Sequence, residues 1–230
     1  MSRFNKEIEK FSGEITKIEV QKKRKDRINI YLDSEYAFSC HIDFIFDFKL
    51  ERGLILEVSQ VKHMVEMDDQ RMAYLYGLRM ALTRSMSIIA CKRKLIQKEF
   101  SEEAAEYAVE KLVENQYLDD LRYAQNYFEM KQSIYGRFRI QQDLMRQGVD
   151  KSIVISVINE NASEELELEE ALKIAHKKMK LETKALDQKA FARIYGFLAR
   201  KGYSAPVIRT VMDQMRSQSK AEFTNFNEFE

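Results

Sequence analysis

The chain has 230 residues, of which 45% are hydrophobic, with only seven Gly and one Pro. This apolar content is enough for a packed core, and so few Gly and Pro residues exclude a fold rich in β-turns. The formal net charge of +1 indicates no class of partner by itself, so only the local distribution of charge is informative.

No run of about 18 apolar residues is present, so we expect no membrane-spanning helix. Residues 1–10 are charged and polar, unlike the apolar core of a signal peptide. Cys40 and Cys91 lack the spacing of a metal site, and two free thiols in a reducing compartment are the simpler interpretation. We therefore expect a cytoplasmic protein.

Alternating apolar and polar residues predict a small antiparallel β-rich segment over residues 1–58. A strand at 15–20 is followed by a basic turn at 21–27, and two further runs of alternation follow. A sheet of about three strands needs a cover, which we expect from a helix that begins near Ser59 and continues towards Arg84. The basic residues of the turn suit either a solvated hairpin tip or contact with nucleic-acid phosphates; they are Lys22, Lys23, Arg24, Lys25 and Arg27.

One pattern occurs three times after residue 70: a Leu, three residues, a Gly-type position and a large apolar residue. The three copies end at Phe100, Val149 and Tyr203, and each is followed by a Ser or Asp, which are good N-cap residues. Apolar residues then recur four, five, eight and nine positions further on, as on one face of a helix. This repetition indicates tandem units rather than one generic helical bundle.

The Gly-type position has a physical reason. Gly148 and Gly202 stand where a helix can end in the left-handed conformation, which suits a residue without a Cβ atom. In that geometry the next apolar residue contacts both the helix that ends and the helix that begins. Glu99 occupies the position in the first copy, at a cost of about 1 kcal/mol. Each copy therefore predicts a sharp corner between two helices.

Further helices at about 118–131 and 170–179 would complete the second and third units. We expect a mainly α fold, in which three tandem three-helix repeats form an elongated curved array behind the small antiparallel β-rich segment. Residues 160–170 hold six Glu and are expected to be a solvated linker into a helix. The predicted segments after residue 58 are 59–115, 116–160 and 161–216 for the repeats and 217–230 for a polar, frayed tail.

Residues that would carry catalysis or hold a cofactor form no recognisable set. His41, His63 and His176 are scattered, without partners at metal-ligand spacing. Asp119 and Asp120 precede an apolar helical run, where helix capping explains them better than catalysis. Glycine motifs of phosphate loops and serine-hydrolase elbows are missing. We expect no catalytic, cofactor-binding or metal-binding residue, and no enzymatic activity.

Basic residues gather on the middle helix of each predicted repeat, before the corner. The helix after the first corner, residues 101–115, instead holds five Glu and one Lys. Stacked basic helices would present a cationic ridge to a polyanion or to an acidic protein groove, and a solvated helix surface is an equal alternative. We name these candidate partner- or DNA-binding residues the basic ridge: Lys92, Arg93, Lys94, Lys98, Arg137, Arg139, Arg146, Lys189, Arg193, Arg200 and Lys201.

The second predicted repeat carries the most specific run of residues. Residues 117–120 read YLDD, followed by Tyr123, Ala124, Gly136, Ile140, Leu144, Gly148 and Val149. This run resembles the signature of the RecX family, the regulators of the RecA recombinase. Residues 29–38 and 200–203 are similar to the family's N-terminal segment and third corner, so the resemblance covers roughly residues 14–215. The first repeat departs from the pattern, with Met86, Ala90 and Cys91 in place of the usual Arg, Glu and Leu.

The resemblance implies a regulator that lies in the helical groove of the RecA filament on single-stranded DNA. It implies modulation, mainly inhibition, of RecA ATP hydrolysis, strand exchange and coprotease activity in DNA repair, recombination and the SOS response. The alternative is a direct DNA-binding protein without a RecA partner, because each corner joins helices at a steep angle. The helix starts carry acidic and small residues, which argues against base readout. We expect a monomer with weak non-specific DNA affinity.

Overall fold

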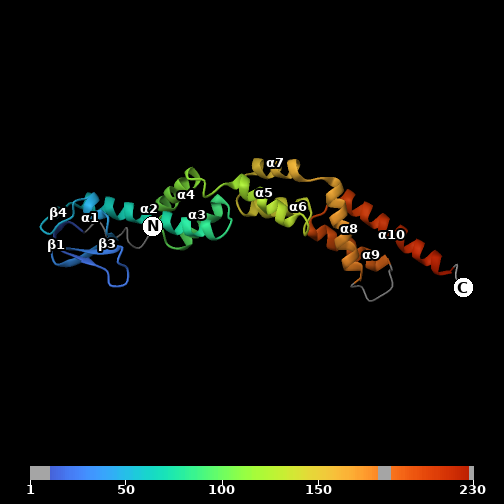
Figure 1. Cartoon of the computed structure of the whole chain (residues 1–230), viewed down its shortest axis with the longest axis horizontal. Helices are drawn as coiled ribbons and strands as arrows, with labels where there is room; N and C mark the ends of the chain where they lie inside the picture. Colours follow the sequence, from blue (N-terminus) through green and yellow to red (C-terminus); the bar gives the residue numbers. More distant parts are fainter. Residues whose placement is uncertain (1–10, 181–187, 228–230) are drawn as a thin grey trace. The chain divides into compact units, whose positions relative to one another are not determined.

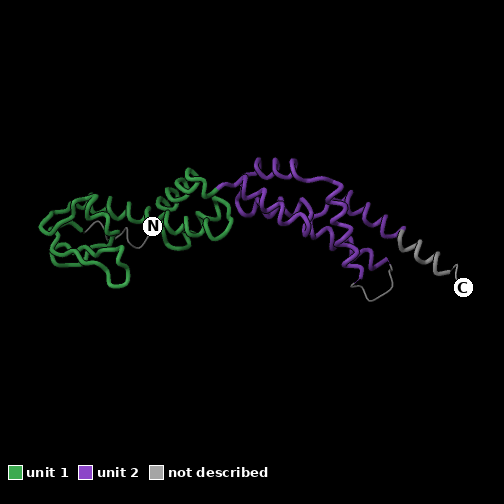
Figure 2. The backbone as a smooth tube through the Cα atoms, in the orientation of Figure 1, with its two compact units in different colours: residues 1–118 green, residues 119–230 purple. Residues whose placement is uncertain are grey.

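The computed structural model describes residues 11–180 and 188–227, with side chains as far as Ser217. The chain divides into two compact units, residues 1–118 and residues 119–230 (Figure 2). In the described part, the strands all lie in the first unit and helices make up the rest (Figure 1). This arrangement confirms the predicted fold class of helical repeats behind a small N-terminal sheet.

The N-terminal sheet is antiparallel, with the strand order β3-β2-β1-β4. Three strands agree with the predicted alternation: β1 (Gly13–Val20), β2 (Arg27–Leu32) and β3 (Glu35–His41). A short helix, α1 (Phe44–Asp47), follows them. The fourth strand, β4 (Ile55–Leu56), is not predicted, because two residues are too few to show an alternating pattern.

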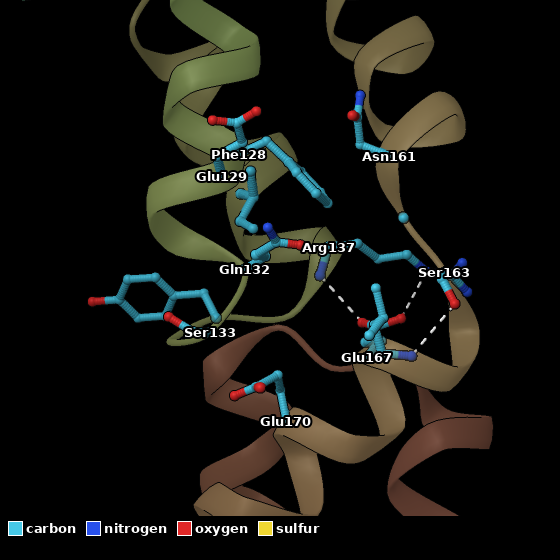
Figure 3. A pocket seen from close by; sticks show the side chains of 13 residues that line it. Phe128, Glu129, Gln132, Ser133, Arg137, Asn161, Ser163, Glu167 and Glu170 are labelled. Atoms are coloured by element: carbon cyan, nitrogen blue, oxygen red, sulfur yellow. Dashed lines mark hydrogen bonds and ion pairs between the residues drawn. The ribbon is translucent and has the colours of Figure 1, made fainter.

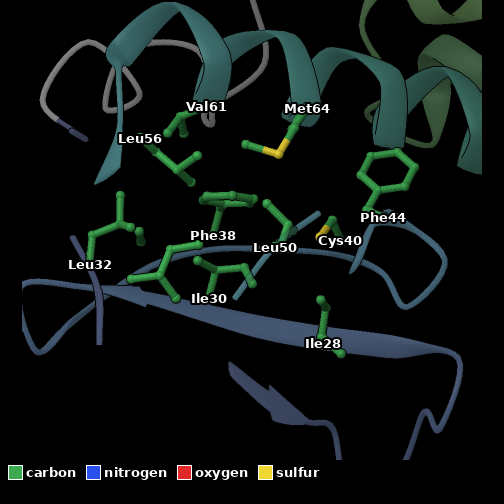
Figure 4. Packing of buried hydrophobic residues seen from close by; sticks show 12 residues of the cluster. Ile28, Ile30, Leu32, Phe38, Cys40, Phe44, Leu50, Leu56, Val61 and Met64 are labelled. Carbon is green, nitrogen blue, oxygen red and sulfur yellow. The ribbon is translucent and has the colours of Figure 1, made fainter. Parts of the chain in front are cut away.

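A long helix, α2 (Val58–Thr83), covers one face of the sheet as expected (Figure 4). Ile30 and Phe38 from the strands pack with Val61 and Met64 of α2, and all four side chains are buried. The apolar face of the sheet therefore gains the partner that so small a sheet needs.

Arg27 corrects one expectation about the basic turn. Its side chain is buried at the start of β2 and donates to both carboxylate oxygens of Asp68 on α2, at 3.2 and 2.7 Å. Asp68 also accepts a hydrogen bond from the backbone amide of His41 at 2.9 Å. Arg27 therefore joins the hairpin to α2 and does not belong to an exposed patch, while residues 22–25 are exposed.

After α1, the described helices form three successive groups of three, each with its own hydrophobic cluster. Repeat 1 contains α2, α3 (Ile88–Gln97) and α4 (Glu102–Glu114). Repeat 2 contains α5 (Asp120–Lys131), α6 (Arg137–Arg146) and α7 (Lys151–Asn161). Repeat 3 contains α8 (Glu164–Lys180), α9 (Gln188–Lys201) and α10 (Ala205–Asn227). The boundaries assigned to the segments from the sequence stay predictions.

The three predicted corners have the expected backbone conformation. Glu99, Gly148 and Gly202 have φ angles of 67°, 89° and 86°, in the left-handed region. At each corner the amide of the following apolar residue donates to the carbonyl of the Leu five positions earlier, at 3.3, 3.2 and 3.3 Å respectively. This bond satisfies a carbonyl that the helix end would otherwise leave without a partner.

The apolar residues at the corners are removed from water to different degrees. Val149 and Tyr203 are each 4% exposed, whereas Phe100 is partly buried and packs beside Tyr76. The first corner is therefore the least enclosed. The next helix begins in each case at a side chain that accepts a backbone hydrogen bond, as predicted from Ser101, Asp150 and Ser204.

A fourth corner of this kind ends α4. Gln116 has a φ of 60°, and the Tyr117 amide donates to the Leu112 carbonyl at 2.8 Å. Asp119 then caps α5 by accepting from the amide of Arg122 at 3.0 Å. No Gly marks this position, although Leu112 and the bulky Tyr117 five positions later have the same spacing as at the other corners.

One expectation about repeat 3 is wrong in detail. The acidic segment is not a solvated linker up to residue 170, because α8 already begins at Glu164 and its Glu167 side chain is buried. Asp and Glu are favourable in a first helical turn, which explains this early start. The backbone of α10 continues as a helix to Asn227, with no Gly or Pro after its first turn, and the fraying expected for residues 217–230 stays a prediction.

Candidate partner-binding surface

In repeat 1, the basic ridge residues lie on α3 and differ in their contacts. Lys92 donates to Glu106 of α4, and this hydrogen bond raises the pKa of the Lys92 ammonium. Arg93 and Lys98 are exposed, and Lys94 is half-buried in the last turn. Lys92 therefore serves to hold α3 against α4, and the other three side chains are better placed to meet a partner.

In repeat 2, each of the three ridge arginines lies beside an acidic side chain. The carboxylate of Asp143 is buried and accepts from Arg139 at 3.2 Å and from Arg146 at 2.7 Å. Tyr127 donates to it as well, at 3.3 Å. Two of the three predicted arginines thus share one carboxylate on the same helix, which offsets one of their two positive charges.

Arg137 is paired with the start of repeat 3. Its guanidinium lies 3.5 Å from Glu167 and 3.8 Å from Glu164, and its backbone amide donates to Glu167 at 3.2 Å. This residue therefore connects α6 to α8. Because Arg137 is paired with these carboxylates, its charge is less available to a partner than the basic pattern of the sequence suggested.

In repeat 3, Lys189, Arg193 and Arg200 are exposed along α9. Lys201 is half-buried and lies over the aromatic ring of Tyr135, 4.7 Å from its centroid. Arg139 lies over the same ring at 5.9 Å. The structure therefore brings one ridge residue from α6 and one from α9 together around Tyr135, where both gain cation–π attraction.

This meeting depends on a backbone junction between the end of α9 and the start of α6. The amides of Gly136 and Phe138 donate to the carbonyls of Lys201 and Gly202, at 3.0 and 3.2 Å. A Cβ atom on Gly136 would overlap the carbonyl group of Gly202, and one on Gly202 would overlap Arg139. Glycine is therefore needed on both sides for the two helix ends to meet.

A cavity of about 280 Å³ lies between repeat 2 and the start of α8 (Figure 3). Phe128 and Ile140 contribute apolar lining, and Glu167 and Glu170 contribute carboxylates from α8. Figure 3 shows Glu167 beside Arg137, with Glu170 one helical turn further along. Burial raises the pKa of Glu167 even though the Arg137 amide and guanidinium act to lower it. A carboxylate is held here at some cost in desolvation.

The residues considered for catalysis stay apart. Cys40 and Cys91 are free and buried, and burial raises their pKa values to about 12 and about 11. Within the described residues, no group of three or more His, Cys, Asp or Glu side chains is arranged to hold a metal ion. Across the same part of the chain, none of the helices combines the length and the apolar character needed to cross a bilayer.

Sequence reasoning missed Asp143, Glu167 and the role of Gly136 as a contact point. Asp143 and Glu167 each stand within a helical pattern that gives no sign of burial, and the partners of Glu167 come from another repeat. Gly136 belonged to a recognised motif, but its neighbour in space is Gly202, far away in the chain. The one feature of the sequence that could have indicated this contact is that Gly136 and Gly202 each stand at the end of a helix.

Three family profiles match separate parts of the chain. "Regulatory protein RecX N-terminal domain" matches residues 13–57. "RecX, second three-helix domain" matches residues 119–156 and "RecX, third three-helix domain" matches residues 164–212. The last two matches fall on helices of repeat 2 and repeat 3.

Curated relatives match over most of the chain. The regulatory protein RecX of Clostridium acetobutylicum is 33% identical over 215 residues, which cover 89% of this chain and 97% of that protein. The regulatory protein RecX of Staphylococcus saprophyticus is 32% identical over 216 residues, which cover 90% of this chain and 77% of that protein.

Solved structures are similar as well. A crystal structure of regulatory protein RecX aligns with a TM-score of 0.67 at 28% identity, covering 88% of this chain and all of the other. The crystal structure of RecX from Lactobacillus salivarius aligns with a TM-score of 0.58 at 20% identity, covering 65% of this chain and 98% of the other. The second likeness concerns the fold alone.

Proposed function

Because this chain belongs to the RecX family of regulatory proteins, we propose that it binds the RecA nucleoprotein filament on single-stranded DNA and lies in its helical groove. There it modulates, and mainly inhibits, RecA ATP hydrolysis, strand exchange and coprotease activity in DNA repair and recombination. It acts in the cytoplasm as a monomer and has no catalytic activity of its own.

The observation that carries this proposal is the succession of matched segments on one chain, from the N-terminal domain to the third three-helix domain. The RecA partner itself comes from the family resemblance and is an analogy. Tandem helical repeats support it physically, because such repeats offer extended surfaces to extended partners.

The exposed members of the basic ridge support binding to a nucleoprotein. Arg93 and Lys98 on α3, and Lys189 and Arg200 on α9, are exposed to solvent. Lysine and arginine at a protein surface strengthen association with phosphate-rich partners and accelerate it. The proposal therefore assigns the main electrostatic contacts to α3 and α9, and gives α6 a smaller share because its arginines are paired.

A direct test adds the protein to RecA and measures DNA-dependent ATP hydrolysis and strand exchange. Both activities should fall as the protein approaches stoichiometric amounts. If both stay unchanged while RecA alone is fully active, the proposed function is wrong.

A pair of matched variants locates the surface. Lys189→Glu with Arg200→Glu should weaken binding to RecA filaments, because both side chains belong to the exposed ridge on α9. The control, Lys151→Glu with Arg209→Glu, makes the same change in charge at exposed positions outside the ridge. Equal losses in cosedimentation with RecA filaments would mean that net charge, and not the α9 surface, governs binding.

A salt series distinguishes direct DNA binding from binding to the RecA filament. The affinity for single-stranded DNA alone should be weak and should fall steeply with salt, as expected for phosphate contacts. Tight DNA binding that persists at high salt and does not change when RecA is added would favour the DNA-binding alternative.

A further inference from the structure

The junction between the end of α9 and the start of α6 gathers positive charge. α9 contains two Lys, two Arg and no acidic residue, and α6 contains three Arg and one Asp. The amides of Gly136 and Phe138 hold the two helix ends together through their hydrogen bonds to the carbonyls of Lys201 and Gly202. The surface around this junction is therefore complementary in charge to a polyanion.

The ammonium group of Lys201 is oriented here by two aromatic rings. Its nitrogen lies 4.7 Å from the ring centroid of Tyr135 and 5.7 Å from that of Phe197. Among the residues that the structure describes, no carboxylate forms an ion pair with Lys201. Attraction to a ring leaves the charge of the ammonium in place, so Lys201 is positioned and still able to bind an anion.

The guanidinium of Arg139 lies beside the same ring and is only partly engaged. It is 5.9 Å from the Tyr135 centroid, and its Nε atom donates to Asp143 at 3.2 Å. Its two terminal amino groups form no hydrogen bond within the described part of the chain, and its side chain is 39% exposed. Donor groups from two different helices therefore adjoin one ring, and phosphate oxygens are acceptors that both can bind.

Phe138 adds an aromatic surface to these cations, because its ring is 48% exposed. Phe138 directly precedes Arg139, and its amide is bonded to the residue that follows Lys201. One helical turn further, Gln142 is exposed on the same face of α6, and its side-chain amide forms no hydrogen bond with the described residues. Aromatic rings with adjoining cations are the combination by which proteins bind single-stranded nucleic acids, since the rings stack on bases and the cations contact phosphates.

We propose that this junction binds a single strand of nucleic acid directly. One base stacks on Phe138 with its edge near the amide of Gln142, and the adjoining phosphates accept hydrogen bonds from Lys201 and Arg139. The inference goes beyond the proposed function, because the contact is with the strand itself and forms without RecA.

A single strand fits these groups better than a duplex or an acidic protein segment. The faces of the bases in a duplex are covered by their neighbours, so none is open to the ring of Phe138. An acidic protein segment satisfies Lys201 and Arg139, but the electronegative face of the Phe138 ring does not attract a carboxylate. An unpaired base with its phosphates makes use of the ring and of both cations.

The first experiment measures binding of the full-length protein to fluorescein-labelled oligothymidine by fluorescence anisotropy, without RecA. A strand of about 20 nucleotides is longer than single-strand sites of roughly 4–16 nucleotides. Phe138→Leu removes the ring but retains an apolar side chain, and it should weaken binding about fivefold or more. Phe138→Tyr retains a ring and should bind as the wild type does.

The matched control is Phe46→Leu, because Phe46 is a largely exposed Phe on α1, outside both helices of the junction. This change should leave the affinity for oligothymidine unaltered. Equal affinities of Phe138→Leu and Phe46→Leu overturn the proposal, and so does a Phe138→Tyr variant that binds as weakly as Phe138→Leu.

A salt series separates the phosphate contacts from stacking. Lys201→Gln removes one cation, so the slope of log affinity against log salt should become shallower by about 0.7, the contribution of one phosphate contact on a single strand. Phe138→Leu should lower the affinity without altering this slope, because no charge is lost. Lys151→Gln, at an exposed position on α7, is the control, and a change in its slope equal to that of Lys201→Gln contradicts the assignment of Lys201.

The last experiment observes stacking itself. The chain has no Trp, so Phe138→Trp introduces a single indole whose fluorescence a stacked base quenches. Oligothymidine should quench this fluorescence, whereas an abasic strand of the same length and polyglutamate should not, and the indole of Phe46→Trp should respond to none of them. Equal quenching by the abasic strand rules out stacking on Phe138, and tighter binding of polyglutamate than of oligothymidine assigns the surface to an acidic protein segment instead.

Discussion

At the residue scale, the positions that end α3, α6 and α9 share one backbone conformation but not one side chain. Gly148 and Gly202 adopt it without a Cβ atom, whereas Glu99 adopts it with a full side chain at φ 67°. A left-handed backbone crowds Cβ against the neighbouring carbonyl oxygen, so the first corner is formed at a higher free energy than the other two.

The change Gly148→Val should lower the free energy of unfolding by about 1–3 kcal/mol, because a β-branched residue is strained at φ 89°. Chemical denaturation of the full chain measures this loss. The reciprocal change, Glu99→Gly, should raise stability by about 1 kcal/mol through relief of the same strain. Two shifts of the same sign would mean that conformation at these corners does not control stability.

The pH dependence of stability should reveal the buried charge of Glu167. Its pKa is raised in the folded state by burial, so the folded chain favours the protonated form, and stability is lost as pH rises from the unfolded pKa through the folded pKa. The side chain in the Glu167→Gln variant cannot ionise, so the variant does not lose stability as the pH rises in this way. Hydrogen exchange of amides in α6 and α8 should show an advantage of the variant that grows as the pH rises above the ordinary pKa of 4.5.

A constant difference between variant and wild type across that pH range would contradict the burial of an ionised Glu167. The control is Glu169→Gln, whose side chain is exposed, and which should show no comparable growth in protection with pH.

At the element scale, the end of α9 and the start of α6 are joined by hydrogen bonds between their backbones, without side chains between them. Gly136→Ala should destabilise this contact, because the backbone of Gly136 at φ −72° and ψ 161° suits alanine but its new Cβ would overlap Gly202. The expected loss exceeds about 1 kcal/mol, as for other overpacked sites. Amide exchange at Phe138 measures it directly.

Gly196→Ala provides the matched control. Gly196 lies inside α9, and a Cβ there would meet only the end of the Arg200 side chain within 4 Å, at 3.4 Å. Because alanine favours the helix over glycine by about 1 kcal/mol, this change should stabilise the chain. The same Gly→Ala substitution should thus have opposite signs at the two sites.

The hairpin is held to α2 by the buried pair of Arg27 and Asp68, and this attachment is also testable. Asp68→Ala should destabilise the first unit by about 3–5 kcal/mol, because it leaves a buried guanidinium without its carboxylate. Asp26→Ala breaks the exposed pair with Arg24 and should change stability little. Similar effects of the two changes, measured by urea denaturation, would refute the distinction.

The elements were largely predictable because they follow local rules. The strand alternation, the Leu-to-apolar spacing across Gly148 and Gly202, and the N-cap residues all act within about nine positions of the chain. The contacts that were not predicted are those between side chains far apart in the sequence. Arg27 finds Asp68, 41 positions away, and Glu167 accepts from Arg137, 30 positions away. Periodicity carries no information about such pairs.

At the scale of the whole molecule, net charge hides how the charges are distributed. The ridge on α6 was predicted from basic residues alone, and the structure places Asp143 between two of them. Asp143 lies four positions after Arg139 and three before Arg146, a spacing at which helical side chains can pair. The assignment of the basic ridge to a partner-binding surface stays a prediction, and the pairing of the α6 arginines with acids could not be read from the basic residues alone.

Removing the balancing acid should raise DNA affinity. Asp143→Asn retains hydrogen-bonding atoms for Arg139 and Arg146 but leaves their charges uncompensated, so each is free to neutralise a phosphate. The slope of log affinity against log salt for single-stranded DNA should steepen by about 0.7 for each added contact. Asp213→Asn, which loosens an exposed pair with Arg216, is the control, and an equal change in slope there would contradict the role of Asp143.

The junction of α9 with α6 also decides how anions can be recognised. The free amides in the first turn of a helix, with the positive end of its dipole, ordinarily make a ready phosphate cradle. In α6 those of Gly136, Arg137 and Phe138 are already engaged by Lys201, Glu167 and Gly202. This helix start is chemically saturated, so a nucleic-acid backbone that approaches the start of α6 must be held there by side chains.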